Sequence, residues 1–348
     1  MTGVRVAGVG LTHFGRHPER TGRDLFGEAA LAAREESAVP PEDIESINYG
    51  NFMGSLSERQ GHQAPLMAEM AGLQCPATRY EEACASAGVA IREAVRTIRS
   101  GEADVMLAGG CERMTNLSTA DVTEGLATAA DELYEIRAGM TFPGAYALME
   151  RAYFEQFGGE REDLAHVAVK NHDNALPNEY AQFHRAITVD EVLDAPMVSE
   201  PIGLLDACPI TDGAGALLLV SEEYAAANDL DAPVSIVGTG QGGDNLALHD
   251  RADLAVTPAT ERAATEAYED AGRSPDDVDV VEVHDCFTIA EPMALEGMGF
   301  YEDGAGIGAA RRGETTAGGE RPVNLSGGLK AKGHPVGATG ASQIVEMT

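Results

Sequence analysis

The feature that most constrains the fold of this chain is a sequence pattern that occurs twice, about 230 residues apart. Each copy has an apolar strand pattern ending in Gly-x-Gly, an alanine-rich helical pattern, and a proline-acidic turn leading into another strand pattern. The paired segments are residues 4–10 and 234–240, 24–37 and 257–272, and 41–51 and 275–285. Short strand–helix units can resemble one another by chance. Three elements in one order at a nearly constant offset favour a duplication.

Strands that alternate with helices predict an α/β fold with a mostly parallel sheet covered on both faces. We expect two halves, residues 1–223 and 224–348, that form a five-layered α/β/α/β/α body. Each half contains a glycine- and alanine-rich turn into a helix, at 84–101 and 333–347. An inserted loop domain at about 115–200 does not repeat, and insertions of this kind commonly carry substrate-binding structure.

The net charge of the chain indicates the salt concentration in which the protein works. There are 57 acidic and 24 basic residues, which give a formal net charge of −33. Such an excess causes self-repulsion at low salt and is a halophile strategy, so we interpret it as adaptation to a high-salt cytosol. An acidic interaction tail is the alternative, but the carboxylates are spread along the chain. No basic stripe is present, which argues against nucleic-acid binding.

The cysteines and the N-terminal segment predict a reduced, cytoplasmic protein. The N-terminal residues do not form a signal-peptide pattern, and no apolar run approaches the length of a membrane span. The number of cysteines is odd and none form a C-x-x-C pair, which argues against a disulfide framework or a metal site. The five are Cys75, Cys84, Cys111, Cys208 and Cys286.

Cys84 is the first candidate for chemistry. Apolar residues recur at helical spacing from Ala87 onward, which places Cys84 and Ser86 at a helix N-terminus. Unpaired N–H groups and the helix dipole favour a thiolate there, and cysteine pKa values fall to roughly 3.5–7.5 in such settings. Small neighbours leave space for a ligand near the sulfur. The alternative is a core cysteine in a tightly packed helix.

Two further turns carry titratable side chains. An apolar strand pattern runs into His284, Asp285 and Cys286, and strand ends of this kind hold ligands in open α/β sheets. A histidine and a cysteine there can transfer protons near neutral pH, although His284 could instead be satisfied by local turn hydrogen bonds. His334 lies in a tight glycine-rich loop, residues 324–341, which lacks the lysine-serine/threonine ending of a Walker loop.

A decoy occurs at residues 238–243, where GTGQGG matches the dinucleotide-binding pattern after a strand. No helical pattern opens directly from it, and no acidic residue at the end of a second strand lies about 20 residues on, so we reject a dinucleotide site. A cysteine with two histidines at three turns is instead a nucleophile-plus-base arrangement, which requires neither a metal nor a redox cofactor.

Together these segments resemble the thiolase superfamily over essentially the whole chain. CASAG and the residues up to Met114 resemble the nucleophile helix and the strand beyond it, and residues 327–340, GGLKAKGHPVGATG, are similar to the family's GHPxGxTG loop. HDCF at 284–287 and the segment 201–223 are typical of the sterol-carrier-protein-type thiolases and the archaeal acetyl-CoA acetyltransferases.

The resemblance implies a role for each candidate. Cys84 takes the acyl group as a thioester and His334 receives its proton. His334 and His284 point N–H groups at the thioester oxygen of the second acyl-CoA, where enolate charge develops. Cys286 is the acid/base at the Cα proton, with a packed cysteine beside another base as the alternative.

The implied activity is that of an acyl-CoA C-acetyltransferase, an acetoacetyl-CoA thiolase that joins two acetyl-CoA molecules by a ping-pong route. Coenzyme A thioesters are its substrates, and no cofactor is expected. A longer-chain 3-ketoacyl-CoA thiolase and a catalytically weak acyl-CoA-binding scaffold are the alternatives. A hydroxymethylglutaryl synthase is disfavoured because it is expected to carry a glutamate base.

The resemblance also implies partners and a longer chain. A homodimer or homotetramer is expected, together with a zinc-ribbon/OB-fold protein and 3-hydroxy-3-methylglutaryl-CoA synthase, in the mevalonate pathway. Thiolases usually continue past the GHP helix with two strands and a CxG loop, so we expect the second half to lack its last strands after Thr348. The cations near the GHP loop could contact coenzyme A or be solvated: Lys330, Lys332, Arg311 and Arg312.

Overall fold

The computed structural model describes residues 2–348 and divides into two compact units. The first unit consists of the residues up to Leu117, Ile210–Val237 and His334–Thr348, and the second of Ser118–Pro209 and Gly238–Gly333. The units are therefore interleaved along the chain, whereas the predicted division at residues 223 and 224 follows sequence order and stays a prediction. No helix among the described residues is long and apolar enough to span a membrane.

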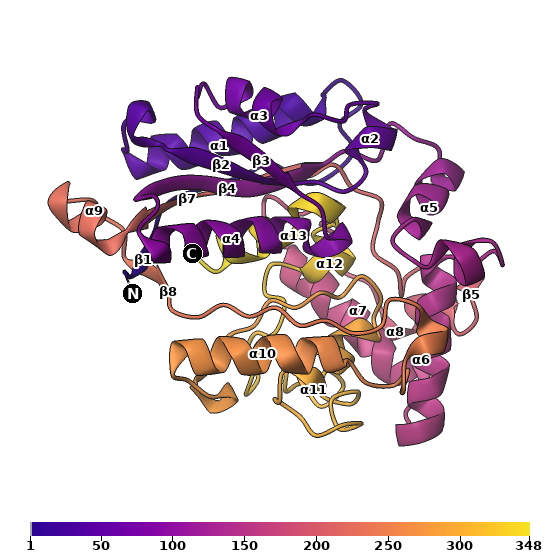
Figure 1. Ribbon diagram of the computed structural model, residues 1–348. Helices are drawn as coiled ribbons and strands as arrows, with labels where there is room; N and C mark the ends of the chain where they lie inside the picture. Colours follow the sequence, from indigo (N-terminus) through magenta and orange to yellow (C-terminus); the bar gives the residue numbers. More distant parts are fainter. Residues whose placement is uncertain (1) are drawn as a thin grey trace. The chain divides into compact units, whose positions relative to one another are not determined.

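The first unit is built on one six-stranded sheet with the strand order β3-β2-β4-β7-β1-β8 (Figure 1). β2 pairs in parallel with β3 and β4, and the pairs β4–β7, β7–β1 and β1–β8 are antiparallel. The strands are β1 (Val4–Leu11), β2 (Ser46–Gly50), β3 (Ala77–Tyr80), β4 (Val105–Glu112), β7 (Gly213–Ser221) and β8 (Val234–Ile236). The α/β class is as predicted, but the prediction of a mostly parallel sheet is wrong.

The antiparallel pairing of β7 with β4 follows from where the chain re-enters the sheet. The chain leaves β4 at Glu112, and the backbone N–H groups of Met114 and Thr115 donate to Asp212 Oδ1 at 2.7 and 2.8 Å. Asp212 directly precedes β7. The chain between β4 and β7 therefore returns to the same end of the central strands from which it left. A strand that starts where its neighbour ends must run in the opposite direction.

Helices cover both faces of this sheet (Figure 1). α1 (Gly22–Ser37) and α3 (Ala64–Met70) pack on one face, and α4 (Ser86–Ser100) and α13 (Thr339–Glu346) on the other. β4 alternates between them, because Val105 and Leu107 join the α1 side and Met106 and Ala108 join the α4 side. Burial on both faces explains why β4 is apolar without alternation. The short helices of this unit are α2 (Gly54–Ser57) and α9 (Glu222–Ala227).

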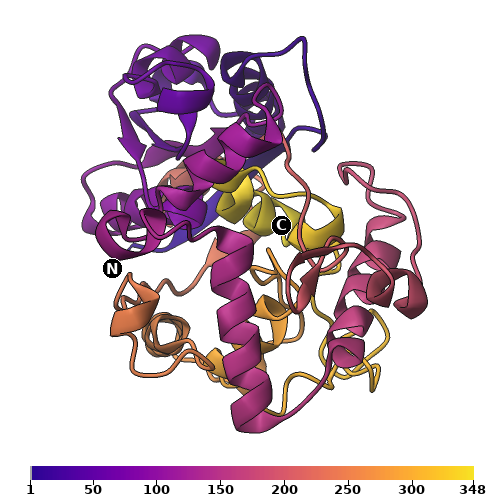
Figure 2. The ribbon, with the colours of Figure 1, turned by 90° about the vertical axis from the view of Figure 1, so that its right-hand side faces the viewer.

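The second unit is mostly helical (Figure 2, in which α10 is seen nearly end on). Its helices are α5 (Thr119–Ala127), α6 (Phe142–Phe157), α7 (Arg161–Ala175), α8 (Val189–Leu193), α10 (Pro258–Ala271), α11 (Ala290–Gly297) and α12 (Gly328–Ala331). Its two-stranded sheet consists of β5 (Met197–Ser199) and β6 (Ile202–Gly203). Its main apolar cluster joins Tyr153 of α6 and Met293 of α11 to Phe287.

The strand pattern at 275–285 forms no ladder in the described residues. Its pairing is one isolated parallel bridge, Val281 with Val323. The next donor, the Val283 N–H, is taken by the Asn324 side chain at 2.8 Å, and Asn324 adopts a left-handed φ of 56°. A residue in that conformation turns the backbone away from an extended path, so the partner segment leaves after one bridge.

A strand–helix contact that matches the repeated pattern occurs in each unit. In the first, a Cβ on Gly8 or Gly10 would overlap the carbonyl oxygen of Ala33 or Ala29 in α1. In the second, alternate glycines of the 238–243 motif, Gly238, Gly240 and Gly242, face Ala267, Ala263 and Ala259 of α10 in the same way. These glycines therefore let an extended segment lie directly on a helix. The motif at 238–243 has a packing role, which agrees with its rejection as a dinucleotide site.

We expect Gly240→Ala to lower the free energy of unfolding by about 1–3 kcal/mol, because the added methyl group overlaps a helix backbone carbonyl. Gly243→Ala is the matched control in the same motif, since nothing lies within 4 Å of its Cβ position. Its effect should stay within about 0.5 kcal/mol. Urea unfolding of both variants measures the difference, and equal stabilities would contradict the packing role.

Candidate active site

Cys84 lies in a tight turn between β3 and α4. The turn is a 3-10 segment, Ala83–Ala85, and Ala83 has a left-handed φ of 45°, which is unfavourable for alanine. The hydroxyl of Ser86 holds this shape by donating to the Ala83 carbonyl at 2.7 Å and accepting from the Glu82 N–H at 2.9 Å. Cys84 is therefore presented just before the first turn of α4, where the helical spacing places it.

The electrostatics of Cys84 differ from the prediction of a lowered pKa. Burial is the largest effect, and together with the nearby Glu112 carboxylate it raises the pKa of the Cys84 thiol to about 12. The helix N-terminus does not outweigh these two effects, because the free energy needed to remove the thiolate from water exceeds the stabilisation by the helix dipole. At neutral pH the resting side chain is the protonated thiol, so it needs a base to react.

His334 is buried, and its position is set by two threonines. Its backbone N–H donates to Thr211 Oγ1 at 3.1 Å, and its ring Nδ1 lies 2.7 Å from Thr339 Oγ1. The Thr339 hydroxyl donates its own proton to the Pro335 carbonyl at 3.2 Å. The hydrogen-bond network thus assigns the ring proton to Nδ1, and Nε2 carries the lone pair of a base.

The first unit brings Cys84 and His334 together. Cys84 Sγ and a ring nitrogen of His334 lie within 4.8 Å of one another. Pairs of this kind often tighten when substrate binds. A thiol beside an imidazole is the arrangement that a nucleophile and its general base require.

The second unit holds His284 and Cys286 on one short segment before α11. Burial lowers the pKa of His284 to about 4, so the ring is neutral at pH 7. Cys286 is buried in the cluster that contains Phe287, and its carbonyl accepts from the Cys208 N–H at 2.9 Å.

Asp285, between these two residues, anchors the segment. Its carboxylate accepts from the Asn171 side chain at 2.7 Å and from the backbone N–H groups of Leu329 and Lys330 at 2.6 and 3.2 Å. Burial raises the pKa of Asp285 to about 7. The sequence identified this residue but assigned it no role.

Sequence reasoning missed Thr339 and Glu112. Thr339 fixes the tautomer of His334, and Glu112 ends β4 with no exposed surface. A signal for Glu112 exists in the sequence, because one charged residue closes the buried run VMLAGGCE, and a buried charge requires partners. Which partners it has depends on the fold.

The candidate contacts to coenzyme A are corrected by the structure. Lys330 and Lys332 are 2% and 1% exposed, so they are neither solvated nor open to a large anionic ligand. Arg311 pairs with Glu160, Glu162 and Asp163 on α7 and the turn before it, and Arg312 pairs with Glu314. Their charge is already largely balanced by carboxylates.

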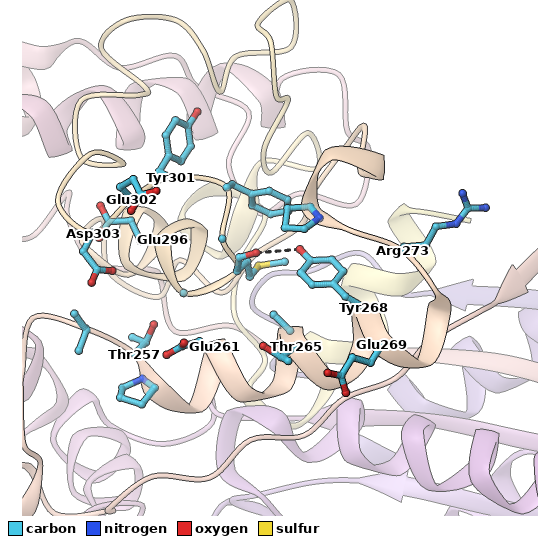
Figure 3. A pocket seen from close by; sticks show the side chains of 18 of the residues that line it. Thr257, Glu261, Thr265, Tyr268, Glu269, Arg273, Glu296, Tyr301, Glu302 and Asp303 are labelled. Carbon is cyan, nitrogen blue, oxygen red and sulfur yellow. Dashed lines mark hydrogen bonds between the residues drawn. The ribbon is translucent and has the colours of Figure 1, made fainter.

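A cavity of about 830 Å³ opens in the second unit between α10, α11 and residues 299–303 (Figure 3). Tyr268 lines the cavity, and its hydroxyl donates a hydrogen bond to the Met298 carbonyl at 3.1 Å. Its one lining arginine is Arg273, whereas five carboxylates line it: Glu261, Glu269, Glu296, Glu302 and Asp303. This charge repels phosphate groups, and none of the four candidate residues lines the cavity.

Comparison with known proteins decides the family. Residues 4–223 match the family described as the thiolase N-terminal domain, and residues 240–348 match the thiolase C-terminal domain-like family. The chain belongs to the thiolase family. The predicted thiolase resemblance and acyltransferase class are therefore confirmed.

Relatives and solved structures agree with this assignment. The chain is 43% identical to an acetyl-CoA acetyltransferase of Methanothermobacter thermautotrophicus, over all of this chain and 90% of that protein. It is 30% identical to sterol carrier protein 2 of Gallus gallus, over 99% of this chain and 65% of that protein. The structure titled Ltp2-ChsH2(DUF35) aldolase matches with a TM-score of 0.84 and 25% identity, over 99% of this chain and 89% of that one.

We expect Thr339→Val to slow reaction at Cys84 with a thioester by about 10- to 100-fold, the usual effect of removing a group that orients a histidine. The valine keeps the shape but leaves Nδ1 of His334 without the hydroxyl that fixes its proton. Ser342→Ala is the control, because that hydroxyl donates only to the Thr339 carbonyl, at 2.9 Å. Rapid-quench mass spectrometry gives the rates. A Thr339→Val rate equal to that of the control would show that the hydroxyl does not matter.

Proposed function

We propose that this thiolase-family chain is an acyl-CoA C-acetyltransferase, an acetoacetyl-CoA thiolase that interconverts two acetyl-CoA molecules with acetoacetyl-CoA and CoA. The observation that carries the proposal is the pair formed by Cys84 Sγ and a ring nitrogen of His334 within 4.8 Å at the start of α4. The name of the 43% identical relative supports acetyl-CoA as the substrate. No cofactor takes part, because coenzyme A enters only as the thioester and leaves as the thiol.

In the first step Cys84 is acylated. His334 Nε2 takes the thiol proton as sulfur attacks the carbonyl carbon of acetyl-CoA, and the carbon–sulfur bond to CoA breaks. The protonated His334 then gives its proton to the departing CoA sulfur. Burial and Glu112 raise the pKa of the resting thiol, which favours transfer of its proton to His334 as the sulfur attacks.

In the second step another acetyl-CoA is condensed. Cys286, as the thiolate, removes the Cα proton, and the resulting carbanion attacks the acyl carbon on Cys84, which breaks the carbon–sulfur bond to Cys84. The Cys84 thiolate that leaves regains a proton, and the proton held by Cys286 is the one that balances it. His284 and His334 direct N–H groups at the thioester oxygen, where enolate charge develops. The low pKa of His284 favours this role, because a neutral imidazole can donate a hydrogen bond from its N–H to the oxygen without transferring the proton.

The first test is acetylation of Cys84. We expect incubation with acetyl-CoA to add one acetyl group to Cys84 and thiolysis of acetoacetyl-CoA to proceed in molar KCl, both lost in Cys84→Ala. Cys75→Ala is the control, since Cys75 is another partly exposed cysteine of the first unit. Peptide mass spectrometry and loss of acetoacetyl-CoA absorbance measure the two reactions.

The other outcomes discriminate between the alternatives. Faster turnover of 3-ketoacyl-CoA with longer chains would identify a longer-chain thiolase. Binding of acetyl-CoA without any mass on Cys84 would contradict the enzyme and identify an acyl-CoA-binding scaffold.

We also propose that the chain works as a homodimer or homotetramer in the cytoplasm, in the mevalonate pathway. A small zinc-ribbon/OB-fold protein and 3-hydroxy-3-methylglutaryl-CoA synthase are the proposed partners. Support for a partner comes from the Ltp2-ChsH2(DUF35) structure, whose title names a second component.

A high-salt cytosol is proposed from charge and from the distribution of cations. The chain has three lysines, and all of them are buried: Lys170, Lys330 and Lys332. The chain as a whole carries a formal net charge of −33, and the basic side chains that remain at its surface are arginines. At about 1 M salt the Debye length shrinks to about 3 Å, so repulsion between surface carboxylates is screened.

We expect the melting temperature to rise by about 5–10 °C between 0.1 and 2 M KCl, since screening stabilises a chain of this charge. NaCl at equal concentration is the control and should give a similar shift, because screening depends on ionic strength. Differential scanning calorimetry measures both. A melting temperature that is constant or falls with salt would overturn the halophilic interpretation.

A further inference from the structure

Glu112 is a buried carboxylate at the point where three segments of the first unit meet. Its Oε1 accepts from the Asn51 side chain at 2.9 Å and from the Met53 N–H at 3.1 Å. Its Oε2 accepts from the Phe52 N–H at 2.9 Å and from the Gly337 N–H at 3.1 Å. Four donors on two oxygens are what an ionised carboxylate can satisfy and an amide cannot.

One of these bonds reaches the turn that carries His334. A Cβ on Gly337 would lie 2.9 Å from Glu112 Oε2 and 2.7 Å from Asn51 Cα, so the turn is seated directly on the carboxylate. Gly337 is three residues after His334, and the intervening 3-10 turn, Val336–Ala338, is buried. The position of the general base is therefore tied to β4 through Glu112.

The same carboxylate acts on the nucleophile. Besides burial, the charge of Glu112 raises the pKa of Cys84. The ionisable groups beside the thiol include Glu112 from β4 and His334 from its loop. Arg79 donates to the carbonyls of Asn51 and Phe52, and its charge partly offsets the rise in the pKa of Glu112, which burial brings to about 7.

We propose that Glu112 is a positioning residue for acyl transfer: it seats the His334 turn beside the Cys84 helix and places a buried carboxylate at the end of β4 on which that turn rests. This inference rests on the proposed function for its catalytic consequence. A standing thiolate is open to oxidation and alkylation, and a thiol is not.

The decisive variant is Glu112→Gln, which removes the charge and turns an NH2 group toward two donors. We expect acetylation of Cys84 by acetyl-CoA to slow by about 10- to 100-fold, as for other orienting groups. We expect alkylation of Cys84 by iodoacetamide between pH 7 and 9 to become about tenfold faster, because loss of a neighbouring negative charge favours the thiolate. A purely structural role predicts no such gain in a folded protein.

Asp212→Asn is the matched control. Asp212 is equally buried and also accepts four hydrogen bonds, from the His17 N–H, the Met114 N–H, and the Thr115 N–H and hydroxyl. Its charge is not among the causes of the raised pKa of Cys84. Alkylation of Cys84 should therefore stay within about twofold of the unmodified protein, given the additive behaviour of independent sites.

A second variant separates charge from position. Glu112→Asp keeps the charge but withdraws the carboxylate from Gly337, so acetylation should slow while alkylation of Cys84 stays at the unmodified rate. Cys111 reports on folding in every sample, since it is 1% exposed and stays unalkylated unless the unit opens.

Three outcomes would overturn the proposal. They are unchanged alkylation of Cys84 in Glu112→Gln with Cys111 protected, an equal gain in Asp212→Asn, or acetylation of Glu112→Gln at the unmodified rate. Failure of the proposed function is distinguishable, because the unmodified protein would then take no acetyl group. The iodoacetamide comparison would still decide the effect of Glu112 on the thiol.

Discussion

Buried carboxylates that collect backbone N–H groups are the interaction on which the rest of this structure depends. Where strands end and the chain turns, backbone donors lose their ladder partners and must find acceptors inside the protein. Glu112 accepts from N–H groups after β2 and before α13, Asp212 from N–H groups after β1 and β4, and Asp285 from N–H groups of α12. Each carboxylate accepts several hydrogen bonds, which offsets part of the cost of burying its charge. The loops around the candidate active site are therefore fixed by charge-assisted hydrogen bonds.

This construction affects reactivity as well as shape. Because the carboxylates are buried, their charges act over short distances with little screening, and Glu112 raises the pKa of the cysteine that the fold presents. The helix N-terminus alone would favour the opposite effect. The pKa of Cys84 is thus set mainly by burial and by one carboxylate, with His334 nearby as the proposed base.

Local sequence patterns predicted the elements well where neighbours in sequence are neighbours in space. The helical spacing from Ala87 to Ile98 places α4 correctly, and every residue of that spacing is buried. The prediction of mostly parallel strands was wrong because the direction of a strand depends on where the chain re-enters the sheet. The hydrogen bond from Met114 to Asp212 holds the start of β7 beside the end of β4. Lys330 and Lys332 were candidates for ligand contact, but a short polar stretch does not reveal that its helix lies inside the unit.

The sequence by itself determined the family, the α/β class and the candidate residues for chemistry, because motifs of small residues, cysteine and histidine at fixed spacing are local properties of the chain. The tertiary structure alone decided that burial and Glu112 raise the pKa of Cys84, that Nδ1 of His334 lies beside the Thr339 hydroxyl, and that Glu112 accepts a hydrogen bond from the turn after His334. Protonation states and hydrogen-bond partners depend on burial and on contacts between residues up to 225 positions apart, as in the bond from Gly337 to Glu112. No pattern in the sequence encodes those distances, since they exist only after the strands and loops have packed.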